Sequence, residues 1–152
     1  MRPRQAKSLH AQAVGLLARR EYARVELEQK LLGKGWDRSE VRATLDELAA
    51  EGYLSDARYA RALVAQKSGR YSRHGIAAEL KTKGVAAQEI EAALADANLD
   101  DEAALAALWQ RRFGRAPADE REKARQVRFL QSRGFSLSAI LKLLRGAKAS
   151  GS

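Results

Sequence analysis

The sequence predicts an all-α protein made of three tandem three-helix repeats. The main observation is a six-residue segment that occurs three times, reading Leu, two variable residues, Lys or Arg, Gly and an apolar residue. The copies are Leu31–Trp36, Leu80–Val85 and Leu130–Phe135, and their glycines are 49 and 50 residues apart. A fixed period of this length is typical of repeat architectures. We call this segment the glycine turn.

The glycine turn has the composition of a helix end. Glycine adopts the left-handed conformation that closes many helices, and the apolar residue after it can fold back on the leucine. The next helix would be capped at Asp37, Ala86 and Ser136 in the three copies. Apolar residues then recur six and ten positions after each glycine, which is the spacing of one helical face. Trp36, Val85 and Phe135 would therefore staple consecutive helices together.

No strand pattern competes with this prediction. The chain has no sustained alternation of polar and apolar residues and only 2 prolines. A single three-helix unit has a small core, so we expect neighbouring repeats to bury further apolar surface.

The first repeat is predicted to span residues 1–54. Residues 1–7 form a basic tail. Three helices follow, the first two near 8–20 and 24–34, and the third from Asp37 to a stop at Gly52. Each helix carries leucine or valine at helical spacing.

The second repeat is predicted to span residues 55–99. Ser55 is a suitable N-cap for a helix that runs to about Ser68. The next helix follows Ser72 and ends at the second glycine turn. The last helix covers about 87–97.

The third repeat is predicted to span residues 100–152. An acidic first turn, Asp100 to Glu102, opens its first helix, as the helix dipole favours. A loop at 114–118 leads to a helix over about 119–133. The last helix follows Ser136, and residues 147–152 are expected to fray.

Composition limits the possible functions. The net charge of +9 favours partners that are polyanions or acidic protein surfaces. No stretch is apolar enough to span a membrane, and the N-terminus lacks the apolar region of a signal peptide. The absence of cysteine excludes disulfides and thiolate chemistry and agrees with a cytoplasmic location. No apolar stripe demands a dimer, so we expect a monomer.

Signs of catalysis are missing. His10 and His74 have no ligand spacing around them, so neither a metal site nor a cofactor is predicted. The acidic residues crowd predicted helix starts, where capping explains them. Phosphate-loop, dinucleotide and nucleophile-elbow motifs are absent.

Basic residues are the feature that points to a function. They gather near the junction of the first and second helices of each repeat, and the third repeat carries the excess, with eleven Lys/Arg against six Asp/Glu. Helix-end capping does not explain Arg125 or Arg128, which are predicted to lie mid-helix. The candidate binding residues are Arg19, Arg20, Arg24, Lys67, Arg70, Arg73, Arg111, Arg112, Arg115, Arg121, Arg125, Arg128 and Arg133.

Tyr22 and Tyr71 occupy matching positions, thirteen residues before Gly35 and Gly84. They could stack on nucleic-acid bases beside the arginines, but packing at the helix junction is the favoured interpretation.

Three segments resemble the RecX family of recombination regulators. They are Tyr53–Arg61, the run from Glu26-Leu27 to Lys34-Gly35, and Phe129–Ser136. Ser55 stands where the family usually has an acidic residue, although it keeps the capping role. The resemblance covers roughly residues 9–146.

The resemblance implies an elongated, curved array of three three-helix repeats. It implies binding to the RecA recombinase filament on single-stranded DNA, in the groove of that filament. Inhibition of ATP hydrolysis and strand exchange would follow, by capping of filament growth or by disassembly. The alternative is a direct nucleic-acid binder in which each repeat acts like a helix-turn-helix. The acidic exposed faces of the third helices in repeats one and two argue against that alternative.

Overall fold

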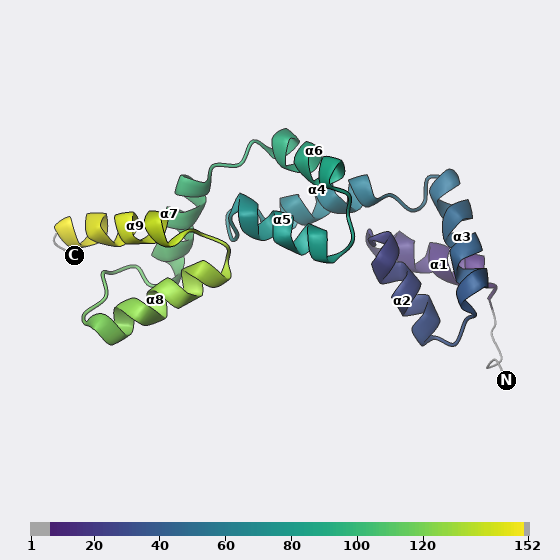
Figure 1. Ribbon diagram of the computed structural model, residues 1–152, viewed down its shortest axis with the longest axis horizontal. Coiled ribbons are helices and arrows are strands. Elements are labelled where there is room, and N and C mark those ends of the chain that lie inside the picture. The colour runs from purple at the N-terminus through teal and green to yellow at the C-terminus, as the bar shows by residue number, and fades with distance from the viewer. Residues whose placement is uncertain (1–6, 151–152) are drawn as a thin grey trace. The chain divides into compact units, whose positions relative to one another are not determined.

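The computed structural model describes residues 7–150 (Figure 1). Nine α-helices and no strands occur in this part of the chain, which confirms the predicted all-α fold. The predicted basic tail lies outside the described residues except for Lys7. The helices are α1 (Leu9–Arg19), α2 (Arg24–Gly33), α3 (Arg38–Ala50), α4 (Asp56–Lys67), α5 (Arg73–Thr82), α6 (Ala87–Ala97), α7 (Asp101–Arg112), α8 (Glu120–Ser132) and α9 (Leu137–Ala149).

The chain divides into two compact units. One unit holds the described residues up to Ala62 together with Leu80–Ala93. The other holds Leu63–Glu79 and the described residues from Leu94 onward. Each unit thus contains one terminal repeat and part of the middle repeat, because the division cuts through α4, α5 and α6.

The three glycine turns close α2, α5 and α8 in the same way. Gly35, Gly84 and Gly134 have φ of 97°, 78° and 91°. In each copy the glycine N–H donates to the carbonyl three residues earlier, and the next N–H donates to the leucine carbonyl five residues earlier, at 3.1–3.4 Å. This pair of bonds is the Schellman motif. The apolar residues Trp36, Val85 and Phe135 are buried.

Serine and aspartate side chains cap several helices, and those of Asp37, Ser55 and Ser136 were predicted to do so. The side chains of Ser8, Asp37 and Ser136 accept backbone N–H bonds at the starts of α1, α3 and α9. Ser55 and Ser72 do the same for α4 and α5, at 3.1 and 2.9 Å. The two terminal repeats have separate apolar cores. One contains Leu27, Leu31, Trp36, Val41 and Leu45, and the other contains Leu105, Trp109, Leu130, Phe135 and Ile140.

The predicted fraying at the C-terminus is wrong for residues 147–149, because α9 continues to Ala149. The half-buried Ala147 packs against the third-repeat core, which holds this last turn in place. Gly151 and Ser152 lie outside the described residues.

Candidate partner-binding surface

The helix α8 presents three arginines on the side opposite its buried residues. Arg121, Arg125 and Arg128 follow one another at intervals of four and three, which places them on one helical face. Gln126 and Leu130 are fully buried on the other side. All three arginines are exposed, and no described residue forms an ion pair with any of them. We call these three residues the arginine face.

A second basic cluster lies beside the arginine face and is organised by aromatic rings. The guanidinium of Arg133 lies 4.7 Å from the ring centroid of Phe129, and that of Arg112 lies 4.5 Å from the same centroid. Arg133 also donates to the hydroxyl of Tyr71 at 3.1 Å. The ammonium of Lys67 lies 4.7 Å from the Tyr71 ring. Helices α4 and α7 and the end of α8 thereby bring Lys67, Arg112 and Arg133 together.

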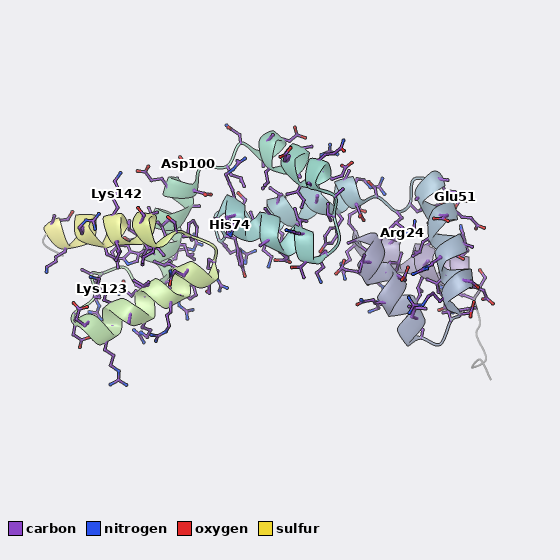
Figure 2. All side chains as sticks on the ribbon, in the orientation of Figure 1. Arg24, Glu51, His74, Asp100, Lys123 and Lys142 are labelled. Carbon is purple, nitrogen blue, oxygen red and sulfur yellow. The ribbon has the colours of Figure 1, made fainter. Side chains whose placement is uncertain are left out.

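The two clusters form one surface. Phe129 follows Arg125 by four residues, so the two side chains are neighbours along α8. We use "basic band" for the arginine face together with Lys67, Arg112 and Arg133. Figure 2 shows further basic side chains of the third repeat, among them Lys123 on α8 and Lys142 on α9.

A buried amide fixes α8 against the rest of its repeat. The indole N–H of Trp109 donates to the side-chain oxygen of Gln126 at 2.9 Å. The amide nitrogen of Gln126 donates to the carbonyl of Arg115 at 3.3 Å and reaches the Glu122 carboxylate at 3.5 Å. Asp119 caps the helix by accepting from the N–H of Glu122. These bonds hold the arginine face on a rigid element, which reduces the entropy lost on binding.

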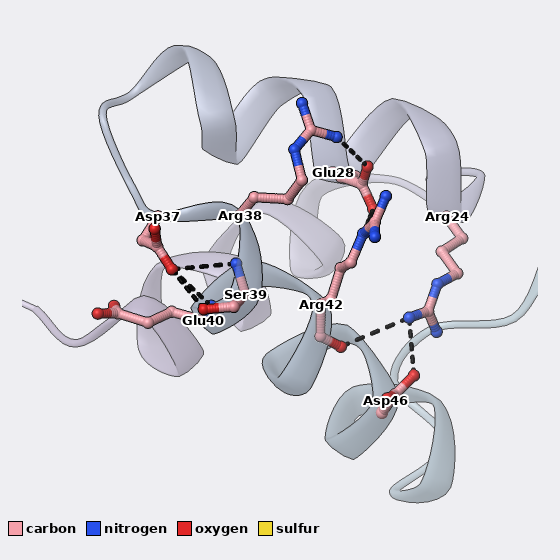
Figure 3. A network of polar contacts seen from close by, with 8 residues as sticks. All are labelled: Arg24, Glu28, Asp37, Arg38, Ser39, Glu40, Arg42 and Asp46. Atoms are coloured by element: carbon pink, nitrogen blue, oxygen red, sulfur yellow. Dashed lines mark hydrogen bonds and ion pairs between the residues drawn. The ribbon is translucent and has the colours of Figure 1, made fainter.

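Two of the predicted arginines of the first repeat, Arg20 and Arg24, are paired within the protein. Arg24 forms an ion pair with Asp46 at 2.7 Å, and its guanidinium also donates to the carbonyl of Arg42 (Figure 3). Arg20 lies 3.4 Å from the Glu26 carboxylate and 3.6 Å from the centroid of the Tyr22 ring. Their charge is partly neutralised, so they are weaker candidates than the arginine face.

The remaining candidates are dispersed. Arg70 and Arg111 donate to the carbonyls of Gln66 and Gly69, which makes them caps for the end of α4. Arg73 is half-buried at the first position of α5. Arg19 and Arg115 are exposed and form no ion pair with a described residue.

The two tyrosines serve packing rather than base stacking. Tyr22 is 6% exposed and belongs to the core of the first repeat. Tyr71 is half-buried and holds two cations close to its ring. A nucleic-acid base would have to displace these contacts to stack.

Sequence reasoning missed Gln126 and the role of Phe129. Nothing in the sequence marks Gln126 as buried, except that it falls on the same helical face as Leu130. Phe129 is visible only as an apolar residue next to arginines.

The described residues contain no group of three or more His, Cys, Asp or Glu side chains that could hold a metal ion. Nε2 of His10 pairs with Glu51 at 2.8 Å, and His74 is exposed on α5. None of the described helices has the length and apolarity needed to cross a membrane.

Comparison with known proteins decides the family. Models of the first, second and third three-helix domains of RecX match residues 10–48, 55–94 and 100–144. The chain belongs to the RecX family. One relative named Regulatory protein RecX, from Ralstonia pickettii (strain 12J), is 41% identical over 145 residues, which cover 95% of this chain and 91% of the relative. A second relative of that name, from Ectopseudomonas mendocina (strain ymp), is 46% identical and covers 88% and 91%.

A solved structure supports the RecX fold. The crystal structure of RecX from Lactobacillus salivarius matches 92% of this chain and 94% of that chain, with a TM-score of 0.64 and 19% identity. The RecX resemblance found in the sequence is thereby confirmed. The names of these relatives describe them as regulatory proteins.

Proposed function

We propose that this RecX-family protein is a cytoplasmic, monomeric regulator that binds the RecA filament on single-stranded DNA, in its groove, and inhibits ATP hydrolysis and strand exchange. The observation that carries the proposal is the basic band, whose residues belong to the third repeat except for Lys67 of the second. The arginine face contributes three positive charges that no described carboxylate neutralises. Such a surface attracts acidic protein groups or phosphates, and its binding weakens as salt rises.

The mechanism we propose is occupancy rather than catalysis. Each repeat is a small helical unit with its own exposed surface, so several weak contacts can add up to tight binding by effective concentration. A protein bound in this way blocks subunit addition or strand access without changing a covalent bond. We therefore propose capping or disassembly of the filament as the means of inhibition.

A RecA activity assay tests the proposal. Substoichiometric wild-type protein should inhibit ATP hydrolysis and strand exchange by RecA on single-stranded DNA, and the absence of inhibition would refute the function. The triple variant R121E/R125E/R128E should inhibit at least about tenfold less, since several charge pairs of up to about 1 kcal/mol each are lost and reversed.

The helix α9 supplies a matched control. Lys142, Arg145 and Lys148 are exposed on the same repeat and lie outside the basic band. The variant K142E/R145E/K148E makes the same change in net charge. It should keep most of the inhibition if the basic band is the binding surface. If both variants lost the same amount of inhibition, the loss would be due to net charge and not to the basic band.

The same pair of variants distinguishes the proposed function from the alternative, a direct nucleic-acid binder with helix-turn-helix-like repeats. A third helix that reads duplex DNA would depend on α9 rather than on α8. In the first repeat, the third helix offers Asp46, whose carboxylate is engaged by Arg24. Sequence-specific duplex binding without RecA, abolished by the α9 variant alone, would favour the alternative.

A further inference from the structure

Two residues of the arginine face, Arg121 and Arg125, occupy positions that serve a different purpose in the first two repeats. The buried leucines Leu31, Leu80 and Leu130 align the three second helices. Five residues before each leucine stand Glu26, Gly75 and Arg125. Nine residues before each leucine stand Tyr22, Tyr71 and Arg121.

In the first repeat, this part of α2 receives the following repeat. The Glu26 carboxylate lies 3.4 Å from the ammonium of Lys83, which belongs to the second glycine turn. Val25 lies so close to Gly84 that a Cβ on the glycine would come within 2.8 Å of a methyl group. The N–H of Arg24 donates to the carboxylate of Asp56, the first residue of α4, at 2.8 Å.

In the second repeat, the same part of α5 receives the third repeat. The N–H of Ser72 donates to the carbonyl of Arg133 at 2.9 Å. A Cβ on Gly75 would lie 2.6 Å from that carbonyl oxygen. The N–H of Arg73 donates to the carboxylate of Asp101, the first residue of α7, at 2.9 Å.

Both connections therefore have the same two components. The incoming repeat brings a carboxylate at the first residue of its first helix, and it brings a glycine turn. The receiving helix is always the second helix of the preceding repeat. In the third repeat the corresponding helix is α8, and no fourth repeat follows within the described chain. Arg125 stands where Glu26 and Gly75 contact the incoming glycine turn, and Lys123 stands where Arg24 and Arg73 donate to the incoming carboxylate.

A second copy of the chain does not fit this face. Its first helix, α1, has no acidic residue in the first turn. Its first glycine turn carries Lys34, which would meet Arg125 where Lys83 meets Glu26 in the connection within the chain. Like charges in contact oppose binding, so head-to-tail stacking of copies is disfavoured.

We propose that the arginine face is a docking site for the acidic first turn of a helix on the partner protein. In the connections within the chain, the N–H groups of Arg24 and Arg73 donate to Asp56 and Asp101. The N–H of Lys123 instead donates to the Asp119 carbonyl inside α8, so the guanidinium groups of the arginine face would supply the donors for a partner carboxylate. Arginine binds carboxylates through two parallel N–H bonds, which suits such a contact. The proposal rests on the proposed function, because the partner is the protein component of the filament.

A carbodiimide cross-linking experiment tests the docking site. The variant R121K/R125K/R128K keeps the charge but supplies amines, which carbodiimide couples to carboxylates in contact. In the complex with RecA on single-stranded DNA, we expect the amines introduced by R121K and R125K to couple to Asp or Glu at the first turn of a RecA helix. Wild-type arginines do not react, and the native Lys142 and Lys148 report background coupling.

The outcomes separate the two proposals. If wild-type protein does not co-sediment with the filament, the proposed function fails and the docking site fails with it. If the lysine variant co-sediments and inhibits, but its new lysines couple to no RecA carboxylate, only the docking site is overturned. If ultraviolet light then cross-linked the α8 segment of the lysine variant to DNA, the arginine face would bind DNA phosphate instead of a RecA helix.

Discussion

The indole N–H of Trp109 is bonded to the side-chain oxygen of Gln126 at 2.9 Å, inside the core of the third repeat. Gln126 is fully buried, and it is one of only two buried polar residues in the described chain. The bond joins α7 to α8 and so sets the position of the arginine face. A core that contains a polar bond of this kind depends on both partners, because a buried group left without a partner is costly.

The variant Q126A should therefore destabilise the third repeat by about 1–3 kcal/mol, because it leaves the Trp109 N–H and the Arg115 carbonyl without a partner. Urea denaturation followed by Trp109 fluorescence, in a W36F background, measures the loss. The matched control is Q12A. Gln12 accepts from the indole of Trp36 at 3.3 Å but is only half-buried, so water can replace it. An equal loss for Q12A, followed in a W109F background, would contradict the role of burial.

Gly75 allows two backbones to come into contact. A Cβ at this position would lie 2.6 Å from the Arg133 carbonyl oxygen, and backbone cannot move aside easily. We expect G75A to cost about 1–3 kcal/mol, as overpacking does. The control is G146A, a helical glycine with no atom within 4 Å of a Cβ.

The control should be stabilised by about 0.5–1 kcal/mol, because alanine has the higher helix propensity. Thermal unfolding compares the two variants. A G75A protein as stable as wild type would show that the contact between α5 and the third glycine turn is not tight.

Glu26 predicts a dependence of stability on pH. Burial acts to raise the pKa of its carboxyl, but the N–H of Ala23 and the charges of Arg20 and Lys83 outweigh burial and lower the pKa. A lowered pKa stabilises the fold above the ordinary pKa of glutamate, about 4.3, and this contribution is lost as pH falls through the lowered value.

The variant E26Q should thus lose about 1 kcal/mol at neutral pH and should approach wild type at acid pH, once the pH has fallen below the lowered pKa and the wild-type carboxyl is protonated. Urea denaturation at the two pH values measures the difference. The exposed Glu47 offers the control E47Q, which should change little at either pH. A gap between E26Q and wild type that persists at acid pH would contradict the electrostatic explanation.

Local signals in the sequence predicted most of the fold. The glycine turns have short-range causes, since the bonds of Gly35, Gly84 and Gly134 reach only a few residues back. The same is true of the caps at Ser55 and Ser72. These features were predictable because the residues that determine them are neighbours in the sequence.

The site was less predictable because its contacts are long-range. Arg24 was a binding candidate together with Arg125, but its charge is partly neutralised by Asp46, 22 residues away in the sequence. Arg133 meets Tyr71 across 62 residues. Charge counting finds the basic repeat, whereas it does not show which arginines are free to bind a partner.

The stacking of guanidinium groups on Phe129 predicts that this residue positions the basic band. In F129L the apolar packing is largely kept, but the contacts of Arg112 and Arg133 with the ring are lost. Each such contact contributes about 0.5–1 kcal/mol at exposed sites. We expect inhibition of RecA to fall several-fold, with a smaller loss of stability than Q126A causes.

The control for F129L is F113L. Phe113 packs edge-on against Phe129 with ring centroids 5.7 Å apart, and it is half-buried. The guanidinium groups of Arg112 and Arg133 lie over Phe129, so F113L should retain inhibition while losing similar packing. Inhibition measured at two salt concentrations adds a second readout. Because the arginines lose their position in F129L, inhibition by this variant should depend less on salt than inhibition by the wild-type protein. If F113L lost as much inhibition as F129L, the ring would act through packing alone, and the positioning of the arginines would not matter.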